Sequence, residues 1–263
     1  MASSMSQKEL FENYFHPRKF LETYFTRESE FFDDTTTKLF SNFIKLSSSG
    51  DVKGDSLTAL CLGPYLQYIL PLCNYFNEIT FACADDKSIQ EIKKWLKNEP
   101  DIMDYSHAMK MICELQGRGE TLPEVEQMLR KKIRTVLECD VTSRNPLSPV
   151  IHPQADCLLL VHCLEHFVTN KKSYCEALKN VSSLVKPGGH LLMITKFCAT
   201  FFMCGDFRFP IFCLEEGFLK DALKGAGYVI EEDHIYPRKT QSLFDVADFQ
   251  YFAVLKARKV REI

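Results

Sequence analysis

The sequence has no excess of charge of one sign and no long apolar run. Its 263 residues include 32 Lys and Arg against 35 Asp and Glu, which gives a formal net charge of −3. Because nucleic-acid-binding proteins concentrate positive charge against phosphates, nucleic acid is not an expected partner. No apolar run approaches the roughly 18 residues that span a bilayer, and residues 1–10 are mostly polar. We therefore expect a cytoplasmic protein without a membrane partner.

The sequence also lacks any Cys-x-x-Cys pair, although it contains 11 cysteines. An odd number of cysteines without this spacing fits neither a disulfide framework nor a zinc site. Most of the cysteines lie within apolar runs, as Cys157 and Cys163 do. This placement predicts buried, reduced thiols, which pack as small apolar side chains.

One segment, 162–166, reads His-Cys-Leu-Glu-His and so matches the order of residues in the inverted zinc peptidases. Two histidines four residues apart share a helical face and could both bind zinc. Here, however, the segment follows directly on an apolar strand instead of lying within a helix. We therefore expect no metal site.

No internal repeat or low-complexity segment interrupts the chain, and its composition, 46% hydrophobic and 25% charged, is that of an ordinary globular protein. An α/β core of this length is self-sufficient, so we expect one domain over residues 1–263. Aromatic residues recur at helical spacing within residues 1–50, which predicts an N-terminal helical cap. Residues 51–263 then form the core of the domain.

From Ser56 onward, short apolar runs alternate with longer amphipathic stretches, the rhythm of βαβ units around a parallel sheet. The apolar run 155–161 is typical of a central strand covered on both faces. The expected strands are 57–62, 78–84, 155–161, 190–195, 228–235 and 251–257, the last two as a hairpin. The expected helices are 35–46, 65–76, one through Ile89 and Trp95, 122–137, 173–185 and 215–226. The fold class is therefore α/β.

Four segments carry a family resemblance. They are Leu-Val-Lys-Pro-Gly-Gly-His-Leu-Leu-Met-Ile at 184–194, Phe-His-Pro-Arg-Lys-Phe-Leu-Glu-Thr-Tyr-Phe at 15–25, Lys-Lys-Trp-Leu-Lys-Asn-Glu-Pro at 93–100, and Cys-Asp-Val-Thr at 139–142. Together they resemble the nicotinamide, indolethylamine and phenylethanolamine N-methyltransferases, which are class I S-adenosylmethionine-dependent enzymes. The similarity extends from about residue 11 to residue 259 and is closest to the nicotinamide branch.

The resemblance implies a Rossmann-like class I methyltransferase fold. Such a fold has a mostly parallel seven-stranded sheet with helices on both faces, here preceded by the N-terminal helical cap. The implied cofactor is S-adenosyl-L-methionine, and the implied reaction moves its methyl group to a nitrogen of a small heteroaromatic or amine acceptor. A nitrogen lone pair attacks the sulfonium methyl directly, so the protein supplies alignment and desolvation and no catalytic nucleophile is expected.

The cofactor positions that the resemblance implies are partly substituted. Relatives read Asp-Ile-Gly-Ser-Gly-Pro where residues 59–64 read Ala-Leu-Cys-Leu-Gly-Pro, so Cys61 and Leu62 depart and Gly63 agrees. Side chains in this turn restrict the approach of the backbone to a ligand. Cys83 replaces the carboxylate that accepts from the ribose hydroxyls, and Asp85 follows closely enough to substitute for it.

Other cofactor positions are kept. Asp140 and Val141 match the family's Asp-Val pair beside the adenine, and Tyr24 matches a tyrosine that closes over the cofactor. Phe20 and Phe25 replace two further tyrosines, which keeps ring area but removes hydroxyls. Ordinary packing of the cap would equally explain these two rings.

The acceptor positions depart further. Thr195 stands where nicotinamide-methylating relatives have aspartate, Phe202 replaces a tyrosine, and Ile211 replaces the serine that contacts the substrate amide. Glu165 aligns with a family aspartate and is expected to face the same pocket. A site built to bind an amide rejects it once those polar groups are lost, so we expect an acceptor more apolar than nicotinamide.

Two functions remain open at this point. One is an active N-methyltransferase, expected to be monomeric, with an altered small-molecule acceptor. The other is a catalytically impaired pseudoenzyme that binds S-adenosylmethionine weakly or not at all and acts as a binding or scaffold protein. Substitutions in both halves of the site lean toward impaired catalysis, while the family's reaction remains the best description of the biochemical class.

Overall fold

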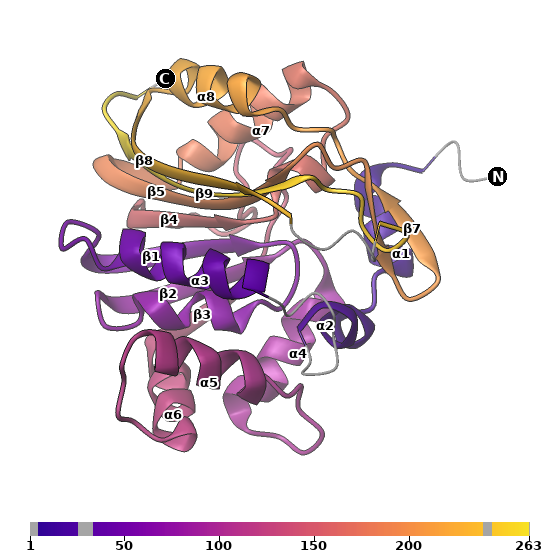
Figure 1. Ribbon diagram of the computed structural model, residues 1–263. Helices are drawn as coiled ribbons and strands as arrows, with labels where there is room; N and C mark the ends of the chain where they lie inside the picture. The colour runs from indigo at the N-terminus through magenta and orange to yellow at the C-terminus, as the bar shows by residue number, and fades with distance from the viewer. Residues whose placement is uncertain (1–4, 26–33, 239–243, 263) are drawn as a thin grey trace.

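The computed structural model describes residues 5–25, 34–238 and 244–262, and its centre is a seven-stranded sheet (Figure 1). The order of its strands is β3-β2-β1-β4-β5-β9-β8. Strands β1 to β5 pair in parallel, and β9 pairs antiparallel with both β5 and β8. Their bounds are β1 Gly54–Cys61, β2 Phe76–Cys83, β3 Ile133–Glu138, β4 Ala155–Val161, β5 Val185–Phe197, β8 Tyr228–Pro237 and β9 Tyr251–Lys259. The expected mostly parallel sheet is confirmed.

The two central strands, β1 and β4, lie beside each other with Leu57 opposite Cys157 and Cys61 opposite Val161. Their apolar sequences suit a position covered on both faces, where polar side chains would find no water. The chain leaves this pair in opposite directions, toward β2 and β3 on one side and toward β5 and β9 on the other. In open α/β sheets, ligands bind outside the carboxyl ends of the strands at such a switch point.

Helices pack around the sheet (Figure 1). The N-terminal helices α1, α2 and α3 confirm the expected cap, and Figure 1 shows α5 and α6 beside β3 and α7 and α8 along the opposite half of the sheet. No described helix is both long and apolar enough to cross a membrane. The helices are α1 Gln7–Tyr14, α2 Pro17–Phe25, α3 Asp34–Ser47, α4 Asp86–Lys97, α5 Ser106–Leu115, α6 Leu122–Lys132, α7 Lys171–Ser182 and α8 Glu216–Gly225.

Two of the helix predictions were wrong, those for residues 65–76 and 122–137. Residues 65–76 form two 3-10 turns, η1 (Leu66–Tyr68) and η2 (Leu70–Leu72), and β2 begins at Phe76. Pro71 lies in the second turn and has no N–H to continue a helix. The helix expected over 122–137 ends at Lys132, because the β-branched residues that follow favour the strand β3, which pairs with β2. The helix α5 and the hairpin of β6 (Phe201–Cys204) with β7 (Phe207–Pro210) were not predicted.

The cap is fixed to the core by aromatic side chains of α1 and of Phe15, the residue that ends this helix. The rings of Phe11 and Phe15 stack with centroids 4.4 Å apart, and Phe15 is fully buried. Phe15 also contacts Phe20 of α2 at 5.4 Å and lies against Gly63, where an added Cβ would come within 3.2 Å of its ring. One side chain therefore joins α1 and α2 to the turn after β1.

Replacing Phe15 with alanine is expected to destabilise the protein by about 3–5 kcal/mol, because a buried ring leaves a cavity that the fold fills only partly. The midpoint of thermal unfolding should fall by roughly 10 °C. The control is Tyr14→Ala, since Tyr14 also stacks on a ring, Phe207 at 4.3 Å, but is 42% exposed. Equal losses in the two variants would contradict the clamping role of Phe15.

Candidate functional site

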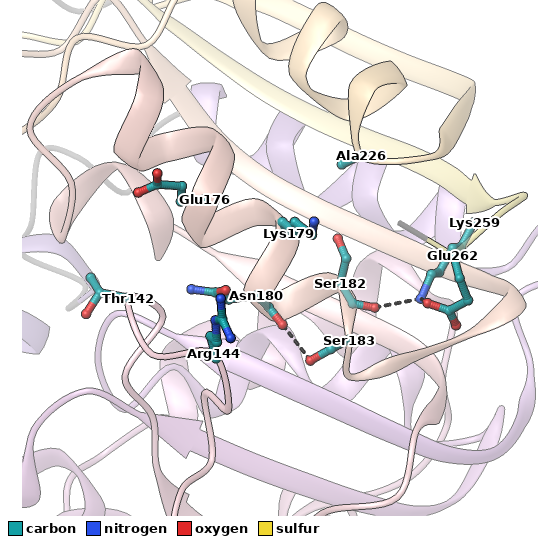
Figure 2. A pocket seen from close by; sticks show the side chains of 10 residues that line it. All are labelled: Thr142, Arg144, Glu176, Lys179, Asn180, Ser182, Ser183, Ala226, Lys259 and Glu262. Carbon is teal, nitrogen blue, oxygen red and sulfur yellow. Dashed lines mark hydrogen bonds and ion pairs between the residues drawn. The ribbon is translucent and has the colours of Figure 1, made fainter.

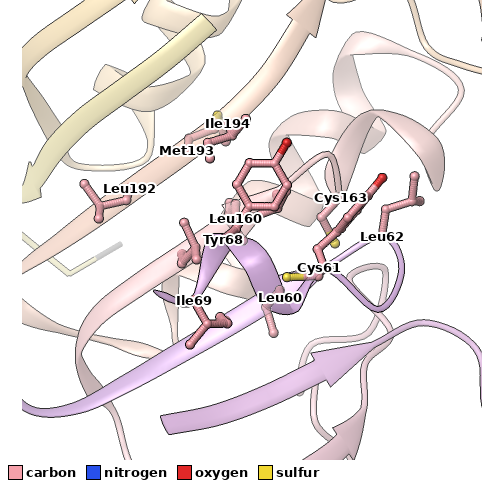
Figure 3. Close-up of a cluster of buried hydrophobic side chains, with 14 of the residues drawn as sticks. Leu60, Cys61, Leu62, Tyr68, Ile69, Leu160, Cys163, Leu192, Met193 and Ile194 are labelled. Atoms are coloured by element: carbon pink, nitrogen blue, oxygen red, sulfur yellow. The ribbon is translucent and has the colours of Figure 1, made fainter. Parts of the chain in front are cut away.

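The candidate site lies at the carboxyl ends of β1, β2 and β4. Figure 3 shows Cys61 and Leu62 gathered there with Cys163, which follows β4, and with the ring of Tyr68. These residues belong to the main hydrophobic core, and each is at most 3% exposed. The carboxyl ends of these strands, where ligands bind in open α/β sheets, are therefore densely packed with apolar side chains.

The turn after β1 is held in that core. Burial raises the pKa of the Cys61 thiol well above its ordinary value, so the group is neutral. The backbone N–H of Leu62 donates to the carbonyl of Val161 at 3.1 Å and is not available to a ligand. Of the three predicted turn residues, Cys61, Leu62 and Gly63, only the glycine has no side chain. Its Cα therefore leaves room for the ring of Phe15.

The end of β2 carries two of the predicted residues with different surroundings. Cys83 is fully buried, and its thiol donates to the carbonyl of Gly63 at 3.3 Å. Asp85 caps helix α4, with Oδ1 accepting from the backbone N–H of Ser88 at 2.8 Å. Its other oxygen, Oδ2, is buried and has no hydrogen-bond partner among the described residues. Burial raises the pKa of Asp85 to about 6, although the Ser88 hydrogen bonds oppose the shift.

A buried carboxylate oxygen without a donor is costly, and native structures rarely leave one unsatisfied. The hydroxyl of a ligand at the sheet edge would satisfy it. That Asp85 substitutes for Cys83 as the carboxylate of this strand end stays a prediction, with which the buried Oδ2 is compatible.

The Asp140–Val141 pair lies in the turn after β3. Asp140 Oδ1 accepts from the backbone N–H and the hydroxyl of Thr142 at 3.0 and 2.6 Å, and its Oδ2 lies 3.6 Å from Lys8 Nζ. Burial opposes the shift, but the Thr142 hydrogen bonds and the Lys8 charge lower the pKa of Asp140. Val141 is 2% exposed, and its carbonyl accepts from Asn180. The carboxylate is thus ionised and held in place.

The three aromatic cap residues share one small cavity. Its volume is about 30 Å³, and its walls include Phe20, Tyr24 and Phe25 from α2, residues from the segments that follow β1 and β4, and residues of β5 and β9. The hydroxyl of Tyr24 points elsewhere, since it donates to the carbonyl of Met203 at 2.9 Å. These cap residues therefore contribute ring faces to the cavity.

The predicted acceptor residues separate into two groups. Thr195 and Glu165 are both buried, and the Thr195 hydroxyl donates to Glu165 Oε1 at 2.8 Å. Phe202 instead stacks on Phe209 at 4.9 Å within the layer beneath α1, and Ile211 packs partly buried at the edge of the core. The structure therefore joins Thr195 to Glu165 and places Phe202 and Ile211 in packing positions. None of these four predicted residues lines the small cavity.

Replacing Thr195 with valine is expected to cost about 1–3 kcal/mol of stability, because it leaves a buried carboxyl oxygen of Glu165 without its donor. Burial already raises the pKa of Glu165, and the Thr195 hydrogen bond opposes that rise, so the variant should raise it further. The control is Thr200→Val, since Thr200 is exposed and donates to Asp248 on the surface. Urea unfolding of both variants tests the difference, and equal effects would contradict the buried pair.

The zinc-peptidase pattern at 162–166 is not on a helix. His162 follows β4 in a left-handed conformation, with φ of 47°, and only a 3-10 turn, η3 (Leu164–His166), comes after it. Within the described residues, the one group with metal-ligand spacing is Asp51, His190 and Glu231. The ammonium of Lys256 lies 3.1 Å from Asp51, so that cluster is already neutralised by a protein cation.

A larger hollow of about 540 Å³ lies elsewhere, between α7 and the turn at 142–144 (Figure 2). Its lining is polar and carries both signs of charge, as Arg144 and Glu176 show. Lys259 Nζ, on its wall, donates to the carbonyl of Ser182 at 2.9 Å. None of the residues predicted for the site lines it, so this hollow is a separate surface feature.

Sequence reasoning missed Lys196, the residue after Thr195. Its Nζ lies in the cavity wall, over the rings of Phe249 at 4.8 Å and Tyr24 at 5.7 Å. Tyr65, Tyr68 and His162 line the same cavity and were also missed. A lysine near the end of a buried strand was the available signal, because such a side chain is costly to bury without a purpose.

Comparison with known proteins identifies the chain. A model of the NNMT/PNMT/TEMT family matches residues 3–260. The chain belongs to this family. Nicotinamide N-methyltransferase from Homo sapiens is 36% identical over 233 residues, which are 88% of each chain. Indolethylamine N-methyltransferase from Oryctolagus cuniculus is 34% identical over 224 residues, 84% of this chain and 85% of the other.

Solved structures agree on the fold of this NNMT/PNMT/TEMT family member. Magnesium protoporphyrin IX methyltransferase from Synechocystis, solved with bound S-adenosylhomocysteine, superposes with a TM-score of 0.59 at 12% identity, covering 97% of this chain and all of that one. The N-methyltransferase NodS from Bradyrhizobium japonicum, in complex with the same compound, superposes with a TM-score of 0.52 at 13% identity over 93% of this chain and 99% of the other. The Rossmann-like class I methyltransferase fold is confirmed.

One residue of this family member has a side chain that fits the family's cofactor, S-adenosyl-L-methionine. A ribose offers two hydroxyl donors, and Asp85 Oδ2 is a buried acceptor that lacks a donor among the described residues. Cys83 does not fit that role, because its neutral thiol is already bonded to Gly63. The assignment of individual cofactor residues, Asp85 included, stays a prediction.

Proposed function

We propose that the protein transfers the methyl group of S-adenosyl-L-methionine to a nitrogen of a small amine or heteroaromatic acceptor. The family match over residues 3–260 supports this reaction, since it extends over both the cap and the core. The same match does not favour the alternative of a catalytically impaired scaffold protein. The structural observation that carries the proposal is Asp85 Oδ2, a buried acceptor without a donor among the described residues, because a ligand hydroxyl could donate to it.

The chain's own residues would bind the cofactor as follows. Asp85 accepts the ribose hydroxyls, and the Asp140–Val141 turn lies beside the adenine with the ionised carboxylate of Asp140 accepting from the exocyclic amine. When bound, the cofactor supplies a sulfonium methyl that a nitrogen lone pair can attack. The rings of Phe20, Tyr24 and Phe25 exclude water from the reacting atoms. The proposal assigns catalysis to alignment and desolvation and needs no covalent nucleophile.

We infer that residues 1–263 act as one domain and as a monomer in the cytoplasm, without nucleic-acid or membrane partners. One continuous hydrophobic cluster contains both Phe11 of the cap and Ala257 of β9, which supports a single unit. The nearly balanced charge supports the absence of a phosphate-binding surface.

Calorimetric titration with S-adenosylhomocysteine, followed by transfer of a labelled methyl group to a panel of small amines and pyridines, tests the proposal. We expect dissociation in the micromolar to submillimolar range and label in at least one acceptor. No heat of binding and no thermal stabilisation at about 1 mM ligand would contradict it. Binding without transfer to any acceptor would instead favour the impaired relative.

A further inference from the structure

We propose that Lys196 selects an acceptor that carries a negative charge, such as a carboxylate on its ring or side chain. This inference rests on the proposed methyl transfer and concerns the same site. The proposed substrate class differs from the apolar acceptor that the substitutions at Thr195, Phe202 and Ile211 predict. That prediction did not take the charge of Lys196 into account.

Lys196 lies where an acceptor would meet the cofactor. It is on β5, close to the carboxyl end of the strand, and it lines the cavity together with His162, which follows β4, and Tyr65, which follows β1. Phe20 and Phe25 of the cap close the same cavity. The ammonium therefore lies near the carboxyl ends of the central strands, in the same cavity as the cap rings that we propose exclude water.

The surroundings hold Nζ as a cation without pairing it. Three rings surround it, those of Phe249 at 4.8 Å, Phe252 at 5.6 Å and Tyr24 at 5.7 Å. Ring faces attract a cation but supply no full negative charge to pair with it. Within the described residues, Lys196 forms no hydrogen bond and no ion pair. Glu165 acts on this ammonium electrostatically but forms no ion pair with it among the described residues.

The two buried lysines on the neighbouring strand show the contrast. Lys256 Nζ lies 3.1 Å from Asp51 Oδ2, and Lys259 Nζ lies 2.9 Å from Glu262 Oε2 and also donates to two carbonyls. Burying a charge without such partners is strongly unfavourable. Lys196 therefore differs from the lysines that serve only to hold the fold together.

The local charge balance is positive. Burial lowers the pKa of Lys196 to about 8, with the Glu165 charge opposing and Arg238 adding to the shift, so about nine-tenths of the molecules still carry the ammonium at pH 7. Burial and the Lys196 charge lower the pKa values of His162 and His166, which keeps both rings neutral. Glu165 has a raised pKa and is bonded to Thr195. A ligand carboxylate would supply the missing negative charge.

The cavity itself is small. Its volume of about 30 Å³ corresponds to about one water molecule, so the surrounding rings must move apart for a ring-sized acceptor. A charge-assisted hydrogen bond to Lys196 offsets part of that cost for an anion, whereas a neutral isostere leaves the ammonium unpaired in a closed site. The discrimination should therefore favour the carboxylate over the amide of the same shape.

Calorimetry on the protein saturated with S-adenosylhomocysteine tests the inference with two isosteric pairs, pyridine-3-carboxylate against pyridine-3-carboxamide and 4-(aminomethyl)benzoate against 4-(aminomethyl)benzamide. We expect the natural protein to bind the carboxylate of at least one pair about tenfold or more tightly. Lys196→Met, which keeps the length of the side chain, should lose this preference, and Lys196→Arg should retain it. Lys45→Met is the control, because Lys45 is exposed on α3.

Several results would overturn the role of Lys196. They are equal binding within both pairs, binding of neither pair, and an unchanged preference in Lys196→Met when thermal unfolding shows that variant to be folded. A mass gain of about 14 Da on Lys196 after incubation with S-adenosylmethionine would also overturn it, by showing that the lysine is itself the methylated amine.

S-adenosylhomocysteine is titrated first, so failure of the proposed function appears as absent cofactor binding. Failure of this inference alone appears as cofactor binding without carboxylate preference.

Discussion

Replacing Asp85 with serine is expected to weaken the binding of S-adenosylhomocysteine by about 10- to 100-fold, because the variant removes the carboxylate that would accept the ribose hydroxyls. Serine is chosen because it also caps helices, so its hydroxyl can still accept from the N–H of Ser88. The effect on the helix is thereby separated from the effect on the ligand. Calorimetry at pH 7.5 measures the affinity.

The matched control is Asp104→Ser. Asp104 accepts from a backbone N–H two residues ahead, at Ser106 close to the start of α5, but it is exposed and lies outside the candidate site. We expect this variant to bind the ligand as the natural protein does. Unchanged affinity in Asp85→Ser would show that the buried oxygen has another role and would remove the main structural support for the cofactor site.

Lowering the pH from 7 to 5 is expected to weaken S-adenosylhomocysteine binding by about tenfold, the second large effect. The pKa of Asp85 in the free protein is raised to about 6 by burial, and ribose hydroxyls donate to the ionised form, so binding lowers that pKa. Protonation below pH 6 therefore competes with the ligand. Asp140 has a lowered pKa and stays ionised over this range, so it should not contribute.

The stability of the free protein should change in the opposite direction. The folded pKa of Asp85 lies above its ordinary value of 3.8, so its contribution to stability is greatest below pH 4 and is lost as the pH rises through 6. The shift corresponds to about 3 kcal/mol at most. Both pH effects should disappear in Asp85→Ser, and an affinity that is flat between pH 5 and 7 in the natural protein would contradict the assignment.

Much of the fold could be predicted because the strands are short, apolar and regularly spaced. The apolar sequences of β1 and β4 predicted central strands covered on both faces. The structure confirms that most residues of both strands are buried. Residues 66–72 could not be predicted in the same way, because their apolar side chains fit a helix or a pair of 3-10 turns and only the missing N–H of Pro71 decides between them. At β3, pairing with β2 overrides the helical charge pattern that precedes it.

The site was less predictable than the fold, because motif positions show which residues are substituted but not what the substitutes contact. That Cys83 stands in place of a family carboxylate stays a prediction, whereas the hydrogen bond from its thiol to the carbonyl of Gly63 is visible only in the structure. That Asp85 Oδ2 has no partner in the described part of the chain depends on its burial, which the sequence does not show. Lys196 depends on three rings from distant segments, two of them on or near β9, and no local pattern contains that information.

The crystal structure of the protein with S-adenosylhomocysteine tests the central claim most directly. We expect the ligand at the carboxyl ends of β1, β2 and β3, with both ribose hydroxyls within hydrogen-bond distance of the Asp85 carboxylate and the adenine beside Val141. A saturated soak that leaves this edge filled by Phe15, Cys61 and Leu62, with the ligand absent or bound elsewhere, would contradict the account.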